Sequence, residues 1–223
     1  MTQEPSKSWM LDLNNFTFID SGCLSAKENM QIDEELISSF KTTDKPILRL
    51  YSWHENSCTI GISQNFEDIP QLEKYKNTYA KRMTGGGVLF HGNDISYSLV
   101  MPTSMMKGLS VKQSYEKICS FLLEFYKSLG LRAMYAKDDD NIVLSKSNYC
   151  QVGFEPYDIV IDGKKIGGNA QRRKKDVIFQ HGSIPLFKSE NDESYSLEDF
   201  GVDVSFERAK NYFKVAGICF GKI

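Results

Sequence analysis

A cysteine and a lysine lie fifteen residues apart in the stretch "NYCQVGFEPYDIVIDGKKIGGNAQRR". The thiolate form of cysteine is a strong nucleophile, and a neighbouring ammonium group favours that form. Cys150 and Lys165 are therefore candidates for covalent catalysis, in which the thiolate carries an acyl group. The alternative is a small core cysteine and a solvated lysine at a hairpin edge. The two groups can meet only if Cys150 lies on a loop folded over the lysine strand.

The glycine run in "RMTGGGVLFHG" is a second candidate site. Gly85, Gly86 and Gly87 have no Cβ, so their backbone N–H groups can approach a phosphate, a carbonyl or a carboxamide oxygen closely. Arg82 precedes the run and can pair with an anion. His91 follows it and is either a ligand contact or a satisfied core histidine. No Gly-Lys-Ser/Thr follows, and a strand rather than a helix comes next, so neither a Walker loop nor a dinucleotide fingerprint is indicated.

The composition narrows the class of protein. The chain has 223 residues and a formal net charge of −2, which argues against nucleic-acid binding. No apolar run approaches the ~20 residues of a membrane span, and the N-terminus lacks a signal-peptide pattern. We therefore expect a cytoplasmic protein. The five cysteines form no CxxC pair and the three histidines are scattered, so neither disulfides nor a metal site is expected.

Apolar periodicity predicts the elements that position these residues. Helical spacing indicates helices near residues 25–40, 110–131, with Gly130 at the end, and 205–220. Cys119 lies on the apolar stripe of the second helix and is expected to be a core residue. Short alternating or apolar runs predict strands at 9–22, ending in a turn at Ser21-Gly22, and at 45–53, 57–63, 79–102 around the glycine run, 157–168 and 176–186.

The segment "YDIVIDGKKIGG" predicts a hairpin with its turn at Asp162-Gly163. Lys165 then lies on the return strand, directly before Gly167-Gly168. The basic run "RRKK" that follows, residues 172–175, is expected to form a solvated turn, which could receive an acidic partner protein. Strands outnumber helices, so we expect an α+β fold, a single domain over residues 1–223 with a central mixed or antiparallel sheet flanked by helices.

Several of these segments occur in the same order in the catalytic domain shared by lipoate–protein ligases, octanoyltransferases and biotin protein ligases. The chain resembles that family from about residue 9 to 186, and it is most similar to the octanoyltransferases that work through a cysteine thioester. The motifs that carry the resemblance are "ENMQIDEEL", "PILRLYSW", "TIGISQ", the loop from Arg82 to His91, "ISYSLVMP", "GKKIGGNAQRR" and "QHGSIPL".

The resemblance implies the family's fold and assigns roles to residues. Cys150 would be the nucleophile, with an aromatic–acidic pair, Tyr157 and Asp158, seven and eight residues later. Lys165 would contact the reacting carbonyl, and the acyl chain would lie in a tunnel beside the glycine loop. The residues expected to bind the acyl substrate are Arg82, Gly85, Gly86, Gly87, His91, Gly168, Asn169 and Ala170.

The reaction implied by the resemblance is a step of protein lipoylation. An octanoyl group would pass from octanoyl–acyl-carrier protein, through the Cys150 thioester, to a lysine of a lipoyl carrier domain, in a glycine cleavage H protein or a dehydrogenase E2 subunit. Because a thioester is converted to an amide, neither ATP nor another cofactor is expected, and no metal.

Three alternatives remain at this point. An ATP-dependent lipoate–protein ligase would form lipoyl-AMP and use ATP and Mg, and the third glycine of the loop is more typical of ligases. The expected lack of an accessory domain favours the transferase instead. A non-catalytic acyl- or carrier-binding protein would retain its ligand without turnover. A biotin ligase fits the lysine–glycine segment and the context of Cys150 less well.

Overall fold

The computed structural model describes residues 16–54, 56–144, 154–189 and 195–220, with side chains up to Ala216. Cys150 lies outside the described residues. In these ranges no helix is both long enough and apolar enough to cross a lipid bilayer. The strands are β1 (Thr17–Leu24), β2 (Ile47–Trp53), β3 (Ser57–Ile60), β4 (Tyr79–Lys81), β5 (Leu89–His91), β6 (Asp94–Pro102), β7 (Ala133–Tyr135), β8 (Ile159–Ile161), β9 (Lys164–Lys165), β10 (Gly168–Lys174) and β11 (Val177–Pro185).

Three α-helices accompany these strands: α1 (Ala26–Ser39), α2 (Val111–Ser128) and α3 (Phe206–Phe220). Short 3₁₀ turns occupy Phe66–Asp68, Pro70–Tyr75, Thr103–Met106, Ala136–Asp138 and Leu197–Phe200. The main sheet has the strand order β1-β2-β6-β11-β10, and two smaller sheets have the orders β4-β3-β5 and β7-β8-β9. In the main sheet β1 and β2 are parallel and the other pairs antiparallel, so the predicted α+β fold with a mixed sheet is confirmed.

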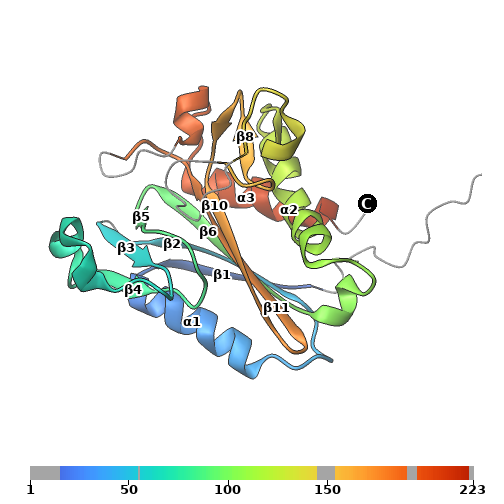
Figure 1. Ribbon diagram of the computed structural model, residues 1–223, viewed down its shortest axis with the longest axis horizontal. Helices are drawn as coiled ribbons and strands as arrows, with labels where there is room; N and C mark the ends of the chain where they lie inside the picture. Colours follow the sequence, from blue (N-terminus) through green and yellow to red (C-terminus); the bar gives the residue numbers. More distant parts are fainter. Residues whose placement is uncertain (1–15, 55, 145–153, 190–194, 221–223) are drawn as a thin grey trace, which may run out of the picture.

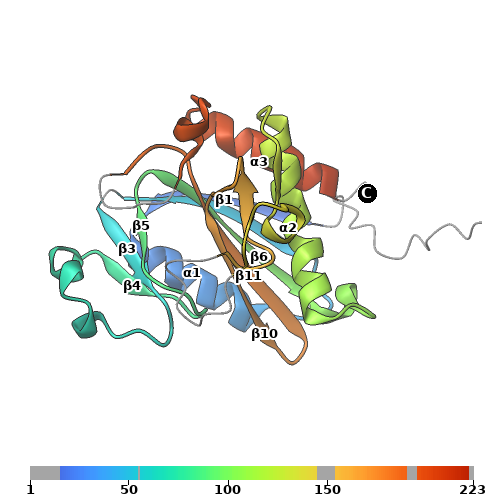
Figure 2. The same ribbon diagram turned by 45° about the horizontal axis from the view of Figure 1, so that its top comes forward.

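The main sheet is covered on both faces (Figure 1). Helices α2 and α3 pack together on one face, and α1 lies on the other beside the β4-β3-β5 sheet, as the tilted view in Figure 2 also shows. Strand β2 is therefore buried on both faces: Leu48 and Leu50 are buried on one face, and Arg49 and Tyr51 are equally buried on the opposite face.

Helices α1 and α2 begin where the sequence predicts. Ser25 caps α1 and Ser110 caps α2, each in a capping box with the residue three positions later. Gly130 follows α2 with φ of 81°, a left-handed conformation that glycine adopts without a Cβ penalty. The predicted helix starts near Ser25 and the predicted end at Gly130 are therefore confirmed.

Two predicted turns are wrong. β1 does not end at Ser21-Gly22 but runs through them, with an irregularity between Asp20 and Cys23 in its pairing with β2. A bulge accommodates Gly22, whose φ is 67°. The basic run begins inside β10, which pairs with β11 as far as Lys174, so the turn starts only at Lys175.

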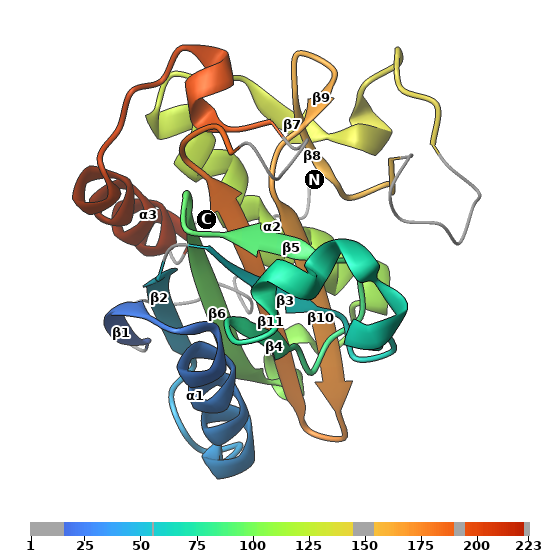
Figure 3. The ribbon, with the colours of Figure 1, turned by 90° about the vertical axis from the view of Figure 1, so that its left-hand side faces the viewer.

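The predicted lysine hairpin is confirmed. β8 and β9 are joined by Asp162 and Gly163, with φ of 49° and 73°. Two consecutive positive φ angles are the signature of a type I′ turn, which suits a two-residue hairpin. Figure 3 shows the β7-β8-β9 sheet beside the start of β10, so Lys165 lies just ahead of the edge strand of the main sheet.

Candidate active site

Arg82 holds the glycine loop between β4 and β5 from its buried side. Its guanidinium group is buried and donates hydrogen bonds to the Thr59 hydroxyl and carbonyl, both at 2.8 Å, and to the Gly87 carbonyl. Burial lowers the pKa of Arg82 to about 10. In this structure the arginine therefore positions the loop, whereas the sequence suggested a partner for a bound anion.

The carbonyls of the loop face the protein. Arg82 binds the carbonyls of Gly85 and Gly87, and a Cβ on Gly61 would overlap the carbonyl of Gly86. The carbonyl and the following N–H of a trans peptide point in opposite directions, and no cis peptide occurs in the described chain. The N–H groups of Gly86 and Val88 are therefore directed away from Arg82, and that of Gly87 away from Gly61. Such N–H groups can bind an anion or a carbonyl oxygen.

Thr84, just before the three glycines, connects the loop to the main sheet by a hydrogen bond. The Thr84 hydroxyl lies 2.6 Å from Nε2 of His181 on β11, and the Thr84 carbonyl accepts the N–H of Ile62 at 2.8 Å. Nδ1 of His181 lies 3.7 Å from the Asp33 carboxylate of α1. Burial lowers the pKa of His181 despite that carboxylate. A neutral imidazole with its Nδ1 proton toward Asp33 accepts the Thr84 hydroxyl at Nε2.

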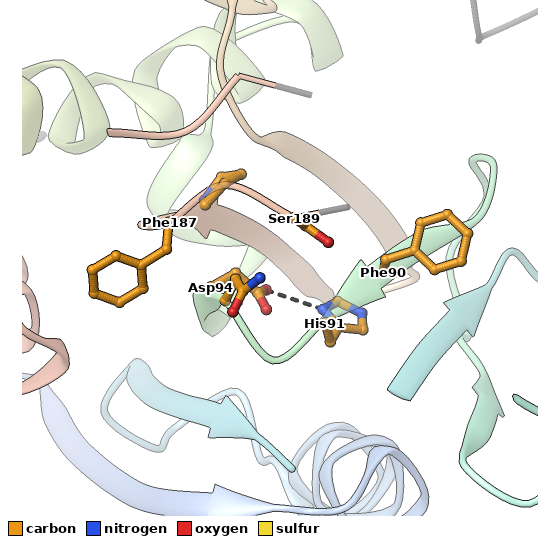
Figure 4. Close-up of a pocket in the computed structure, with 7 residues that line it drawn as sticks. Phe90, His91, Asp94, Phe187 and Ser189 are labelled. Atoms are coloured by element: carbon orange, nitrogen blue, oxygen red, sulfur yellow. Dashed lines mark hydrogen bonds and ion pairs between the residues drawn. The ribbon is translucent and has the colours of Figure 1, made fainter. Parts of the chain in front are cut away.

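His91, at the far end of the loop, is a satisfied core histidine in this structure. Its Nδ1 lies 3.0 Å from Asp94, its Nε2 lies 2.8 Å from the Thr59 hydroxyl, and its ring stacks on Trp53. Burial raises the pKa of Asp94, but His91 and the hydrogen bonds from Ser183 and a backbone N–H outweigh it, so the pKa is lowered. Figure 4 shows this pair beside a cavity of about 20 Å³, enough for a water molecule and too small for an acyl chain.

Lys165 forms an ion pair in the second part of the site. Its Nζ lies 2.7 Å from Oδ2 of Asp158. Lys165 pairs with Val160 across the hairpin, and Asp158 precedes Val160 by two residues, so both side chains lie on the same face. The Asp158 carboxylate also accepts the N–H of Glu155 at 2.9 Å, which holds it in place. The Lys165 side chain is 37% exposed, so a substrate can reach its ammonium group.

Aromatic rings lie close to Tyr157, the residue before Asp158. The ring of Tyr157 lies 6.0 Å from the rings of Tyr115 and Tyr135. The negative charge of Asp158 contributes to the raised pKa of Tyr115, although burial is the main cause. The predicted aromatic–acidic pair, Tyr157 and Asp158, thus lies beside Lys165 and Tyr115.

Asn169 follows the glycine pair at the start of β10. The Tyr97 hydroxyl donates to Oδ1 of Asn169 at 2.7 Å, and the Tyr115 hydroxyl donates to its backbone carbonyl at 3.0 Å. Gly167 has φ of 65°, and a Cβ there would overlap the carbonyl of Ser183, so only glycine fits this approach to β11. Gly168 is half-buried, and Ala170 pairs with His181.

Of the three described cysteines, Cys23 is exposed and the other two are buried. Cys119 is fully buried, as predicted, and burial raises its pKa to about 12. Burial likewise raises the pKa of Cys58 to about 11. Neither favours the thiolate at neutral pH. Among the described residues no three His, Cys, Asp or Glu side chains converge as a metal site would require.

Two hydrogen bonds connect the glycine loop to β10 and β11. The hydrogen bond between Thr84 and His181 makes one connection, and Arg172 of β10 makes the other by donating to the Met83 carbonyl at 2.7 Å. Within the described ranges no hydrogen bond or ion pair joins Lys165 to the loop. A substrate would have to extend between the two.

Sequence reasoning missed the polar cluster that supports the loop. Asp33 of α1 is buried and accepts hydrogen bonds from Arg49, Ser98 and Tyr51. The signal available was Arg49, a charged residue inside an otherwise apolar strand, which needs a buried partner. His181 was noted only as part of "QHGSIPL", and Thr84 only as a neighbour of the glycines.

Known proteins are similar to this chain in sequence and in fold. The model of the lipoyl protein ligase A/B catalytic domain matches residues 25–198. Octanoyltransferase LipM of Bacillus cereus is 34% identical over 221 residues, covering 92% of this chain and 77% of that protein.

Two solved structures agree with the fold. Lipoate-protein ligase A bound with ATP has a TM-score of 0.76 at 22% identity, over 92% of this chain and 85% of that one. The bi-partite lipoate protein ligase of Thermoplasma acidophilum, described with its E2 lipoyl domain, has a TM-score of 0.71 at 21% identity, over 92% of this chain and 83% of that one. The structures support the fold predicted from the sequence, and the family match and the Bacillus relative show that the chain belongs to the lipoyl protein ligase A/B catalytic domain family.

Proposed function

We propose that this protein is an octanoyltransferase that moves an octanoyl group from an acyl-carrier protein to a lysine of a lipoyl carrier domain. The observation that carries the proposal is the similarity to octanoyltransferase LipM over 92% of the chain. The pairing of Lys165 with Asp158 supports it, because it holds an ammonium group at an accessible position, fifteen residues after Cys150 in the sequence.

The first step would load Cys150. Its thiolate attacks the carbonyl carbon of the octanoyl thioester, a C–S bond forms, and the carbonyl electron pair moves onto oxygen. When that oxyanion collapses, the bond to the sulfur of the carrier breaks, and the carrier leaves as a thiol after taking up one proton. Lys165 would favour the Cys150 thiolate before the attack and supply the proton afterwards.

The second step would transfer the octanoyl group to the acceptor. The amine of the acceptor lysine attacks the Cys150 thioester, a C–N bond forms, and the bond to the Cys150 sulfur breaks. The proton released by the amine returns to Lys165 or to the sulfur. Because a thioester is less stable than an amide, this sequence requires no ATP.

The loop would bind the octanoyl group, and backbone N–H groups near Gly168-Asn169 would stabilise the oxyanion at the reacting carbonyl. The acyl tunnel beside the loop stays a prediction. The basic end of β10 stays the predicted contact for an acidic carrier protein. Arg172 and Lys174 line an open groove of about 480 Å³ beside α1, and Glu34 and Glu35 of α1 line it as well. A lipoyl carrier domain is the proposed acceptor, and the bi-partite lipoate protein ligase of similar fold was described with its E2 lipoyl domain.

An ATP-dependent lipoate–protein ligase is the second candidate. The specific observation in its favour is the loop, because successive N–H groups suit the oxygens of a phosphate as well as a carbonyl. A lipoate-protein ligase A with a similar fold was solved with ATP. In that case lipoyl-AMP would replace the Cys150 thioester, and Lys165 would contact the reacting carbonyl.

A two-substrate assay separates the candidates. Purified protein is incubated with a lipoyl carrier domain and either octanoyl–acyl-carrier protein without ATP, or lipoate with ATP and Mg, and the mass of the carrier domain is measured. We expect octanoylation in the first mixture. Modification only in the second mixture, with release of AMP, would establish the ligase, and modification in neither would leave a non-catalytic binding protein.

A further inference from the structure

A chain of polar side chains runs through β10, β11 and β6 to Asn169, and its direction is determined by its first member. Arg173 has only N–H donors. Its Nε donates to Oε1 of Gln171 at 3.0 Å, and Nε2 of Gln171 therefore faces Gln180, where it donates to Oε1 at 3.0 Å. Each amide can present only one oxygen, so the orientation of the first determines that of the second.

The chain continues from Gln180 into the core. Nε2 of Gln180 donates a hydrogen bond to the Tyr97 hydroxyl oxygen at 2.9 Å. The hydroxyl O–H must therefore donate its own hydrogen bond to another group. It donates to Oδ1 of Asn169 at 2.7 Å. Burial raises the pKa of Tyr97 well above its usual value, so the hydroxyl keeps the proton that this bond needs.

The last amide is thereby oriented. Because Oδ1 of Asn169 faces Tyr97, Nδ2 points the opposite way with its two N–H groups. Steric fit supports the same placement, because a Cβ on Gly182 would overlap Oδ1 of Asn169. Every fully buried side-chain nitrogen and oxygen in the described residues has a hydrogen-bond partner, and none is recorded for Nδ2 of Asn169, so this group is open to solvent or ligand.

We propose that Nδ2 of Asn169 is a hydrogen-bond donor to the oxyanion of the acyl-transfer reaction, held in orientation by the chain that runs from Arg173 through Gln171, Gln180 and Tyr97. Asn169 follows Lys165 by four residues, and Tyr115, whose hydroxyl binds the Asn169 carbonyl, lies within the electrostatic influence of Asp158. Asn169 is thus a catalytic residue, and Tyr97 and Gln180 are positioning residues. This inference rests on the proposed function.

The donor would act at one point in each step. When sulfur or nitrogen attacks, the carbonyl electron pair moves onto oxygen, and an N–H of Asn169 donates to that charge without giving up its proton. A donor that is already oriented needs no reorganisation at that moment, which is why such groups affect the rate more than substrate binding.

The test compares substitutions along the chain in steady-state octanoyl transfer. Asn169→Asp keeps the size and removes the donor, and we expect kcat to fall about a hundredfold with little change in KM for the carrier. Tyr97→Phe leaves the amide in place but free to rotate, and we expect a smaller loss of about tenfold. The matched control is Tyr75→Phe, which removes the hydroxyl of a buried tyrosine in the turn Pro70–Tyr75, outside the polar chain, and should keep wild-type kcat.

A second measurement stands independently of catalysis. The side-chain amide resonances of Asn169, assigned by their loss in Asn169→Asp, should shift in Tyr97→Phe and stay in place in Tyr75→Phe. Wild-type kcat in Asn169→Asp would overturn the catalytic role, and amide resonances insensitive to Tyr97→Phe would overturn the orientation. If the wild-type protein transfers no octanoyl group, the proposed function fails by itself, and the resonances still decide whether the chain orients Asn169.

Discussion

The glycine loop and the lysine hairpin differ in how their groups are held and in how accessible those groups are. The loop is held on its inner side by the buried residues Arg82, Thr84 and Gly61. Lys165 is held by one carboxylate and remains 37% exposed. A preorganised backbone can bind an oxygen atom without rearranging, whereas a group that takes up and releases protons must stay accessible. The difference indicates that the loop binds and the hairpin reacts.

Removing the charge of Lys165 should give the largest effect. In Lys165→Met we expect acyl transfer to fall by about 10²–10⁴-fold, the range for loss of a proton-transferring group. The measurement is the single-turnover rate of octanoyl transfer. Lys164→Met, on the same two-residue strand with an exposed side chain, is the matched control and should retain activity. Equal activity in both variants would remove the lysine from the mechanism.

Crowding the loop should damage folding as well as activity. In Gly61→Ala the new methyl group would overlap the Gly86 carbonyl, and we expect the free energy of unfolding to fall by about 1–3 kcal/mol. Gly85→Ala, which has no neighbour within 4 Å of the added Cβ, should change stability by less than about 0.5 kcal/mol. Urea denaturation compares the two. Equal stabilities would show that the loop is not packed as described.

Neutralising Asp158 tests how the hairpin positions its lysine. In Asp158→Asn the size is kept and the ion pair lost, and we expect the transfer rate to fall about tenfold because Lys165 is no longer held. Asp162→Asn is the control, since Asn tolerates the positive φ of the turn. An Asp158→Asn variant with an unchanged rate would indicate that the ion pair has no part in positioning the lysine.

The smallest effect concerns the pH dependence of the loop anchor. The folded-state pKa of His181 lies below its unfolded value of about 6.5, so the unfolded chain binds a proton first as the pH falls. The contribution of His181 to stability is therefore fully present above about pH 6.5 and decreases below it. Urea denaturation from about pH 7.5 to 5.5 should show a weaker decrease in His181→Gln. The same decrease in both proteins would assign it to other groups.

The sequence predicted the local features of the fold well and the buried polar contacts poorly. The caps at Ser25 and Gly130, and the turn at Asp162-Gly163, depend on a few neighbouring residues, so they can be read directly. The sequence predicts a turn at Ser21-Gly22 where the structure has a bulge, because glycine is common in both. The basic run was assigned to a turn because the strand pairing that extends through Lys174 depends on β11, a separate segment.

The site was predicted in part. The ion pair between Lys165 and Asp158 follows from the hairpin register, and the sequence identified both residues. The links from Thr84 to His181 and from Arg173 to Asn169 join segments that are distant in the chain or cross several strands, so no local pattern indicates them. The assignment of one domain to residues 1–223, and the role of Cys150, remain predictions.

The central claim is that Cys150 carries the octanoyl group, and intact-mass analysis tests it directly. The wild-type protein and Cys150→Ala are each incubated with octanoyl–acyl-carrier protein, with and without ATP. We predict that the wild type gains the mass of one octanoyl group without ATP and that Cys150→Ala gains none and transfers none. A wild-type protein that stays unmodified, or a Cys150→Ala variant that transfers the octanoyl group at the wild-type rate, would contradict the account.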